Sequence, residues 1–322
     1  MAQRVGEKMS TQPLRIIFMG TPDFAAATLQ ALIDGPDDVI AVVTQPDRAK
    51  GRGKKLTPPP TKVIAEEAGI PVLQPTKIKT EEFRNGLLTY QPDLFVVAAY
   101  GRILPPSILE LAPLGCINVH GSLLPKYRGA APIQWAVINR DKEVGVTIIQ
   151  MNEGMDTGDI LLKRSIEAAE DETAGSLFVK LAQLGSETLL KAVKGLKDGT
   201  VIPIPQNHEE ATSAPMFTKD DGCINWQKDA GELEGLIRGL DPWPTAFCFL
   251  DGKRLRLFSP EVVHKDSDHE PGVVIQADKR GILVACGTNC LLVREIQPEG
   301  KKRMSVEAFL CGCDLQPGTE LF

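Results

Sequence analysis

An asparagine and a histidine, Asn118 and His120, lie two residues apart at the end of the apolar run CINVH. If this run is a β-strand, alternate side chains point to the same side, so the carboxamide and the imidazole share one direction. A carboxylate, Asp156, follows in the acidic stretch NEGMDTGD after a second apolar run. A carboxamide can donate to a developing oxyanion, an imidazole can stabilise charge or move a proton, and a carboxylate can orient that imidazole. The three side chains together indicate acyl transfer.

None of these side chains is a strong nucleophile. Direct attack by an amine of the substrate therefore fits this set better than a covalent acyl-enzyme does. A structural interpretation also fits the residues, because polar side chains at strand ends and in turns often satisfy only nearby backbone groups. From the residue types alone, both interpretations stay open.

Up to about residue 200, apolar runs alternate with helical patterns, which predicts a doubly wound, mostly parallel α/β sheet. Thr21 and Pro22 are expected to cap and open a helix after the first strand. Open sheets of this class bind ligands at the carboxyl ends of their strands, where Asn118 and His120 fall. The expected strands cover 14–20, 39–44, 71–73, 93–101, 116–120, 145–151 and 159–166, and further helices cover 62–68, 81–88 and 175–197.

The pattern changes beyond residue 200. Residues 201–217 are polar and rich in proline, which suits a linker between a catalytic domain at 14–200 and a second domain. Residues 218–322 contain five short strand patterns punctuated by Gly and Asp, with helices near 231–238 and 306–310. This spacing predicts a small OB-like β-barrel. Residues 1–13 are expected to form a flexible tail in which Met9 is an alternative start to Met1.

Several functional classes are excluded by missing motifs. The turn GTPDF is not the dinucleotide-binding G-x-G-x-x-G, and the chain has neither a P-loop nor a G-x-S-x-G elbow. Seven cysteines without a C-x-x-C pair indicate neither a disulfide framework nor a zinc site. No apolar run approaches the roughly 20 residues of a membrane span, and no signal peptide is evident. We expect a cytoplasmic, monomeric enzyme that uses no metal.

The segment INVHGSLLPKYRGAAPI and the later MDTGD resemble the folate-dependent formyltransferase family, whose signature is N-x-H, S-L-L-P and a downstream Asp. IIFMGTPDFA, VVAAYGRILP, DPWP and QPEGKKRMS extend the resemblance over nearly the whole chain. With the basic TQPDRAKGRGKKL, they narrow it to members that formylate an initiator methionyl-tRNA. The resemblance implies a one-carbon transferase with 10-formyltetrahydrofolate as the formyl donor and the initiator methionyl-tRNA as its partner.

The resemblance also implies roles for particular residues. Asn118, His120 and Asp156 match the catalytic trio without substitution, and Phe24 is a candidate wall of the methionyl pocket. The expected folate-binding residues are Tyr100, Gly101, Arg102, Ile103, Leu104, Ser122, Leu123, Leu124 and Pro125. The expected tRNA-binding residues are Arg48, Lys50, Arg52, Lys54, Lys55, Lys301, Lys302 and Arg303.

The basic residues of TQPDRAKGRGKKL are expected to lie in a long loop at the carboxyl end of a strand, beside the candidate site. A basic run of this kind is usually a solvated loop, but its arginines and lysines can also pair with phosphates and read base edges. The second domain is acidic, because from residue 207 onward 13 Lys and Arg face 19 Asp and Glu. Phosphate contacts there would have to come from local clusters such as 301–303.

Three competing functions remain at this stage. The first is formylation of a small amine, such as a nucleotide-linked amino sugar or glycinamide ribotide, which needs neither the basic segment nor the barrel. The second is hydrolysis of 10-formyltetrahydrofolate with water in place of the amine. The third is a noncatalytic RNA-binding module that retains the fold of a transferase.

Overall fold

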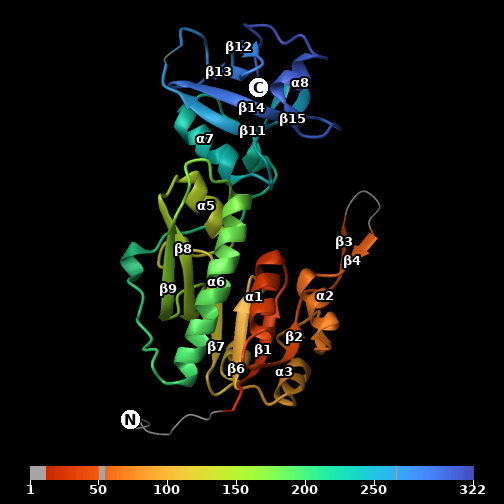
Figure 1. Cartoon of the computed structure of the whole chain (residues 1–322), viewed down its shortest axis with the longest axis vertical. Helices are drawn as coiled ribbons and strands as arrows, with labels where there is room; N and C mark the ends of the chain where they lie inside the picture. Colours follow the sequence, from red (N-terminus) through yellow and green to blue (C-terminus); the bar gives the residue numbers. More distant parts are fainter. Residues whose placement is uncertain (1–11, 51–54, 266) are drawn as a thin grey trace. The chain divides into compact units, whose positions relative to one another are not determined.

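The computed structural model describes residues 12–50, 55–265 and 267–322. The chain divides into two compact units (Figure 1). The first unit combines residues up to 130 with 144–166 and 178–214, and the second combines 131–143, 167–177 and 215–322. Residues 201–214, which the sequence suggested as part of a linker, therefore belong to the first unit.

The first unit is built on a seven-stranded sheet in the order β5-β2-β1-β6-β7-β8-β9. The strands from β5 to β7 are parallel, and β8 runs antiparallel to β7, which confirms the expected mostly parallel sheet. Their buried apolar runs are typical of strands covered on both faces. The bounds are β1 (Arg15–Gly20), β2 (Asp38–Val43), β5 (Val72–Leu73), β6 (Leu94–Ala98), β7 (Cys116–His120), β8 (Glu143–Gln150) and β9 (Ile160–Glu167).

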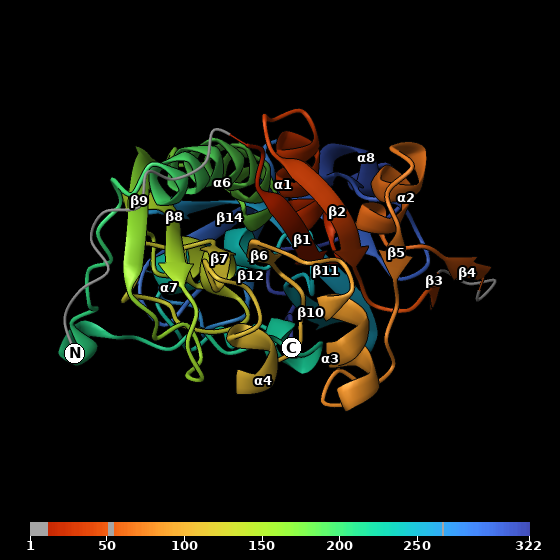
Figure 2. The same cartoon turned by 90° about the horizontal axis from the view of Figure 1, so that it is seen from below.

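Helices cover both faces of this sheet (Figure 2). On one face, Leu87 and Ile108 pack with the strand residues Phe95 and Val97 in a buried cluster. On the other face, Gly185 packs closely against Val119. The helices are α1 (Asp23–Ile33), α2 (Pro60–Glu67), α3 (Glu81–Leu88), α4 (Pro106–Leu109) and α6 (Ala174–Lys197).

Two local expectations from the sequence are wrong. Pro22, and not Thr21, occupies the N-cap position of α1, and no side chain caps this helix. The hydroxyl of Thr21 donates instead to the carbonyl of Tyr100 at 3.5 Å, so it joins two neighbouring strand ends. The basic segment is not only a loop, because β3 (Arg48–Lys50) and β4 (Lys55–Thr57) pair antiparallel. Backbone pairing of two short polar strands gives little periodic signal in a sequence.

The second unit contains a curled antiparallel sheet in the order β10-β11-β14-β13-β12, with β15 paired to β14. Because β11 lies beside β14 and not beside β12, the connection is of the Greek-key kind. This arrangement confirms the expected small β-domain. The bounds are β10 (Phe247–Leu250), β11 (Lys253–Val263), β12 (Val274–Asp278), β13 (Gly281–Ala285), β14 (Cys290–Pro298) and β15 (Met304–Ser305).

Helices close one core on this sheet. Leu233 and Ile237 of α7 (Ala230–Gly239) pack with Leu257, Val284 and other buried residues of the strands. Asp229 caps α7 by accepting from the backbone N–H of Gly231. The remaining helices of this unit are α5 (Pro132–Ile138) and α8 (Val306–Leu310). Among the described residues, no helix is long and apolar enough to cross a membrane.

Candidate active site

Asn118 and His120 occupy alternate positions of β7, and both side chains are buried. Because β1, β6 and β7 are parallel, the ends of all three strands meet at one edge of the sheet. The loop between β8 and β9 brings Asp156 to the same edge, where its carboxylate oxygen Oδ2 lies 3.6 Å from Nδ1 of His120. The structure thus brings His120 and Asp156 together as the sequence pattern predicted.

Each ring nitrogen of His120 faces an oxygen atom. Nε2 lies 2.9 Å from the backbone carbonyl of Tyr127, which can only accept, so this nitrogen carries a proton. Nδ1 faces Asp156, whose Oδ2 also accepts a hydrogen bond from the backbone N–H of Gly129 at 2.9 Å. The ring therefore has an oxygen atom on both sides, and the carboxylate is itself held in place.

The turn that follows His120 is anchored by side chains of the neighbouring strands. Thr147 of β8 is fully buried; its hydroxyl donates to the carbonyl of Ser122 at 2.7 Å and accepts from the N–H of Leu124 at 3.0 Å. Lys163 donates to the carbonyl of Leu124 at 2.8 Å. Among the expected folate-binding residues here, Leu124 and Pro125 are buried and Leu123 is half-buried. The turn is therefore a fixed wall beside His120.

The segment Tyr100–Leu104 follows β6 at the same edge. The rings and chains of Tyr100 and Leu104 belong to the buried core, whereas Gly101 is exposed and Ile103 is 68% exposed. A Cβ at Gly101 would meet nothing within 4 Å, so open space adjoins this backbone. Arg102 donates to Oε1 of Gln45 and to the carbonyl of Thr76.

The phenol oxygen of Tyr100 is buried and has no hydrogen-bond partner among the described residues. Burial raises the pKa of the Tyr100 phenol. An unpaired buried hydroxyl is costly, and its burial in the core keeps it away from a ligand bound at the surface. The exposed apolar side chain of Ile103 and the open space beside Gly101 suit contact with a flat ring system.

Known proteins resemble this chain over nearly its whole length. The family described as formyl transferase matches residues 14–193, and the formyl transferase C-terminal domain matches residues 216–314. A methionyl-tRNA formyltransferase of Desulfotalea psychrophila is 68% identical over 308 residues, covering 96% of this chain and 95% of the relative. That of Acetivibrio thermocellus is 48% identical, covering 96% and 99%.

The chain belongs to the methionyl-tRNA formyltransferase family. HypX from Aquifex aeolicus, solved in complex with tetrahydrofolic acid, resembles it in fold with a TM-score of 0.61 and 16% identity. This similarity covers 93% of the chain but only 47% of HypX. Formyltransferases use folate derivatives, and the family resemblance seen in the sequence is confirmed.

The basic segment of this family member lies partly outside the described residues. Arg48 is exposed on β3, and Lys50 pairs with Lys55 through the two backbones. Arg52 and Lys54 fall outside the residues that the structure describes. The expected tRNA contacts of this segment therefore remain a prediction.

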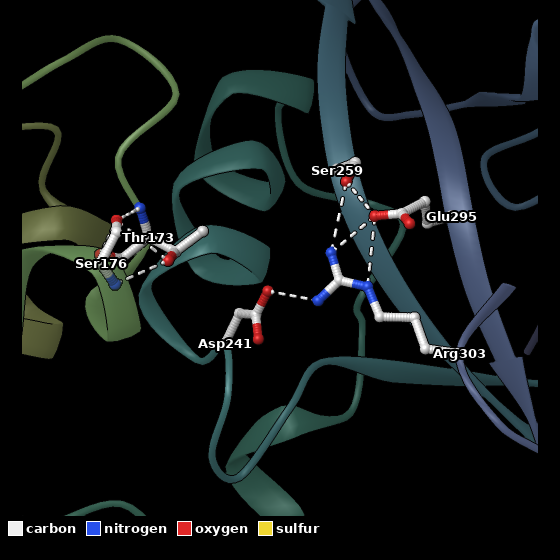
Figure 3. A network of polar contacts seen from close by, with 6 residues as sticks. All are labelled: Thr173, Ser176, Asp241, Ser259, Glu295 and Arg303. Atoms are coloured by element: carbon white, nitrogen blue, oxygen red, sulfur yellow. Dashed lines mark hydrogen bonds and ion pairs between the residues drawn. The ribbon is translucent and has the colours of Figure 1, made fainter. Parts of the chain in front are cut away.

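Arg303, expected to contact tRNA, is engaged within its own unit (Figure 3). Its guanidinium contacts Asp241 at 3.0 Å and Glu295 at 2.6 Å, and it lies 4.1 Å from the ring centre of Phe258. Ser259 also donates to Glu295 at 2.7 Å. The guanidinium therefore joins β11, β14 and the turn after α7, and few of its donors are available to a phosphate. Lys301 and Lys302 are exposed.

We expect Arg303→Ala to lower the melting temperature of the protein by a few degrees, because a network of ion pairs and a cation–π contact is lost. The hydrogen bond from Ser259 and then that from Arg303 hold the pKa of Glu295 below its usual range. A carboxyl whose pKa is depressed on folding adds stability at neutral pH and loses it as the pH falls through the folded pKa.

The difference in melting temperature between the native protein and Arg303→Ala should consequently shrink in acid. Arg254→Ala is the matched control, because Arg254 lies over the ring of Phe247 and no carboxylate contact is recorded for it among the described residues. Its effect on melting should stay constant with pH. A pH-independent effect of Arg303→Ala would contradict the coupling to Glu295.

Phe24 lies in the interior of the first unit. Its ring packs edge-to-face on Phe178 at 5.5 Å between centroids, and only 4% of the residue is exposed. The structure therefore places it between α1 and α6 as a core residue. For Phe24 to contact the methionine side chain of a substrate, the packing of its ring against Phe178 would have to change.

One residue that the sequence did not single out is Gln206. It lies in the polar stretch PIPQNHEE, where a glutamine gives no signal of burial, yet it is 5% exposed in the structure. Its amide contacts the loops on both sides of the candidate site. Only the tertiary arrangement reveals it.

Proposed function

We propose that this chain transfers a formyl group from 10-formyltetrahydrofolate to the α-amine of the initiator methionyl-tRNA. The observation that carries the proposal is the meeting of His120 and Asp156, beside Asn118, in a chain that matches methionyl-tRNA formyltransferases over nearly its full length. A cytoplasmic location and a monomeric state, expected from the sequence, belong to the same proposal.

In the proposed reaction, the nitrogen of the methionyl amine attacks the formyl carbon, and the carbonyl electrons move to oxygen. The amide of Asn118 makes no hydrogen bond to another group among the described residues. It is therefore available to donate to this oxyanion. His120 lies at the second alternate position of β7 and stabilises the same charge. The tetrahedral intermediate formed in this way then collapses, and the bond between the formyl carbon and the folate nitrogen breaks. The folate nitrogen receives the proton that the amine loses. Asp156 keeps the ring of His120 oriented during this transfer.

We place the folate at the edge formed by residues 100–104 and 122–125. Gly101 and Ile103 offer the accessible backbone and the apolar surface, whereas the turn with Leu124 supplies the wall. Arg102 is held by Gln45 and by the carbonyl of Thr76, and it can present its two remaining N–H donors to a polar edge of the ligand. This arrangement would put the formyl carbon beside the end of β7.

We assign catalysis to a domain at residues 14–200. We assign tRNA binding mainly to residues 218–322 and to the basic segment TQPDRAKGRGKKL. Because the second domain is acidic overall, its phosphate contacts would depend on exposed lysines such as Lys301 and Lys302. Arg48 and the neighbouring basic residues would engage the acceptor end of the tRNA. A steep loss of tRNA binding with rising salt is expected for such contacts.

Among these basic residues, we expect Arg52 to contribute most. Arg52→Ala should raise KM for the tRNA about 10-fold or more, the effect of losing about 1.4 kcal/mol of binding, while KM for the folate stays unchanged. Steady-state kinetics with each substrate varied in turn measure this difference. Arg84→Ala, which removes an arginine from α3, is the matched control. Unchanged kinetics of Arg52→Ala with tRNA would eliminate this role.

The proposed function is tested by incubating the protein with 10-formyltetrahydrofolate and either initiator or elongator methionyl-tRNA. We expect formyl-methionyl-tRNA only with the initiator. Release of formate without an acceptor would indicate hydrolysis instead, and formylation of a free amino sugar or ribotide amine would indicate a small-molecule substrate. Binding of tRNA without any transfer would favour a noncatalytic module.

A further inference from the structure

The chain segment 206–214 lies against the two loops that flank His120. Gln206 at its start is buried, and Ala214 at its end donates its N–H to the carbonyl of Arg128 at 2.7 Å. Between them, Thr212 accepts from the N–H of Tyr127 through its hydroxyl and from the N–H of Arg128 through its carbonyl, both at 2.8 Å. The end of the segment, at Thr212 and Ala214, is therefore paired with the chain after the Ser122 turn.

All four hydrogen-bonding positions of the Gln206 amide are used. Its Nε2 donates to the carbonyl of Asp156 at 2.8 Å and to that of Gly158 at 2.7 Å. Its Oε1 accepts from Nε of Arg128 at 3.1 Å and from Nη2 at 2.7 Å. An amide has two donors and two acceptor positions, so this one is fully satisfied in a buried place. One side chain thus ties the loop after β7 to the loop between β8 and β9.

These two loops are the ones that contact the imidazole of His120. Tyr127, which precedes Arg128, supplies the carbonyl opposite Nε2, and Asp156 supplies the carboxylate opposite Nδ1. Asp156 has a φ of +54°, a conformation that costs energy for a residue other than glycine. The hydrogen bond from Gln206 to its carbonyl helps to fix that conformation.

The loop after β7 and the segment 206–214 approach each other closely near this contact. Gly129 has a φ of +126°, and a Cβ there would lie 2.7 Å from the carbonyl oxygen of Ala214. Its N–H donates to Oδ2 of Asp156 at 2.9 Å. The same short stretch therefore touches both the segment 206–214 and the carboxylate.

We propose that Gln206 is a positioning residue for the formyl transfer, setting the separation of the two loops between which the ring of His120 is held. The inference rests on the proposed function of His120 and Asp156. Gln206 acts through the carbonyl of Asp156 and through Arg128. A displacement of about 1 Å in such an arrangement can cost about 10²-fold in rate.

Two variants separate the contacts of Gln206. Gln206→Glu keeps the shape and the acceptor toward Arg128 but places an oxygen opposite the carbonyls of Asp156 and Gly158. Gln206→Leu removes both sets of hydrogen bonds. We expect both variants to lower kcat about 10- to 100-fold, with KM for the folate and the tRNA changed less than about 3-fold. Asn207→Ala, at the adjacent exposed residue, is the control and should leave kcat unchanged.

A double-mutant cycle with Asp156→Asn tests whether Gln206 acts through Asp156. If it does, Gln206→Leu should lower kcat much less in the Asp156→Asn background than in the native protein. Multiplicative losses in kcat would mean that Gln206 has only a general structural role and would overturn the proposal. So would a variant whose melting temperature falls while kcat stays native.

The outcome also separates this inference from the proposed function. Native kcat in Asp156→Asn itself would contradict the assigned chemistry. A large loss in Asp156→Asn together with native kcat in both Gln206 variants would overturn only the positioning role.

Discussion

Replacing His120 by alanine is expected to lower kcat for formylation of methionyl-tRNA by about 10²- to 10³-fold, the usual loss when a group that stabilises a developing oxyanion is removed. The reason is geometric, because Nε2 is bonded to the carbonyl of Tyr127 and Nδ1 faces Asp156, so a freely moving water could not take the place of the oriented ring. Single-turnover formylation with saturating 10-formyltetrahydrofolate measures the effect on the chemical step. KM for the tRNA should change little.

The control for this prediction is His264→Ala, which removes an exposed histidine of the second unit. Thermal unfolding of both variants shows whether lost activity reflects lost folding. If His120→Ala folds and forms product at the native rate, the assigned chemistry is wrong. A noncatalytic role for the chain would then need to be considered again.

The second large effect is expected at Asn118. Asn118→Ala should lower kcat about 10²- to 10³-fold, the usual consequence of removing one donor to an oxyanion. Asn118→Asp should be more damaging, because a carboxylate would face the developing negative charge. Asn118 is buried on β7, opposite Ile149 of β8. Bulk water therefore could not take over the role of its amide without a change in packing.

Asn85→Ala on the exposed surface of α3 is the matched control for Asn118, and formylation kinetics with folate and tRNA varied separately are the measurement. A ground-state role in substrate binding would appear as a raised KM at unchanged kcat. That outcome would contradict oxyanion stabilisation by Asn118. Equal losses in kcat and in kcat/KM would support it.

Much of the first unit could be predicted from periodic patterns. The apolar runs that became β1, β6 and β7 are long and bounded by turn residues, and burial on both faces gives such strands a strong signal. The side chains of Asn118 and His120 could be predicted to point to the same face of the sheet, because side-chain direction in a strand repeats every two residues. The approach of Asp156 depended further on the order of strands in the sheet.

Other features had no local signal. The pairing of β3 with β4, the bond of Thr21 to Tyr100 in place of a cap on α1, and the burial of Phe24 each depend on contacts with residues outside the local segment. In the sequence, Arg303 is one of three consecutive basic residues, 301–303. In the structure it forms ion pairs with two acidic residues and lies over an aromatic ring. A charge run records composition, whereas the partners of each charge are set by folding.

The sequence by itself determined the class of sheet, the two kinds of domain, the resemblance to formyltransferases and the candidate trio, because periodicity and motif spacing are local properties of the chain. Only the tertiary structure decided that residues 201–214 belong to the first unit and that Gln206 joins the loops around His120. Hydrogen bonds between Gln206 and residues about 50 and 78 positions away depend on how the strands are ordered in space. Such contacts leave no periodic trace along the chain.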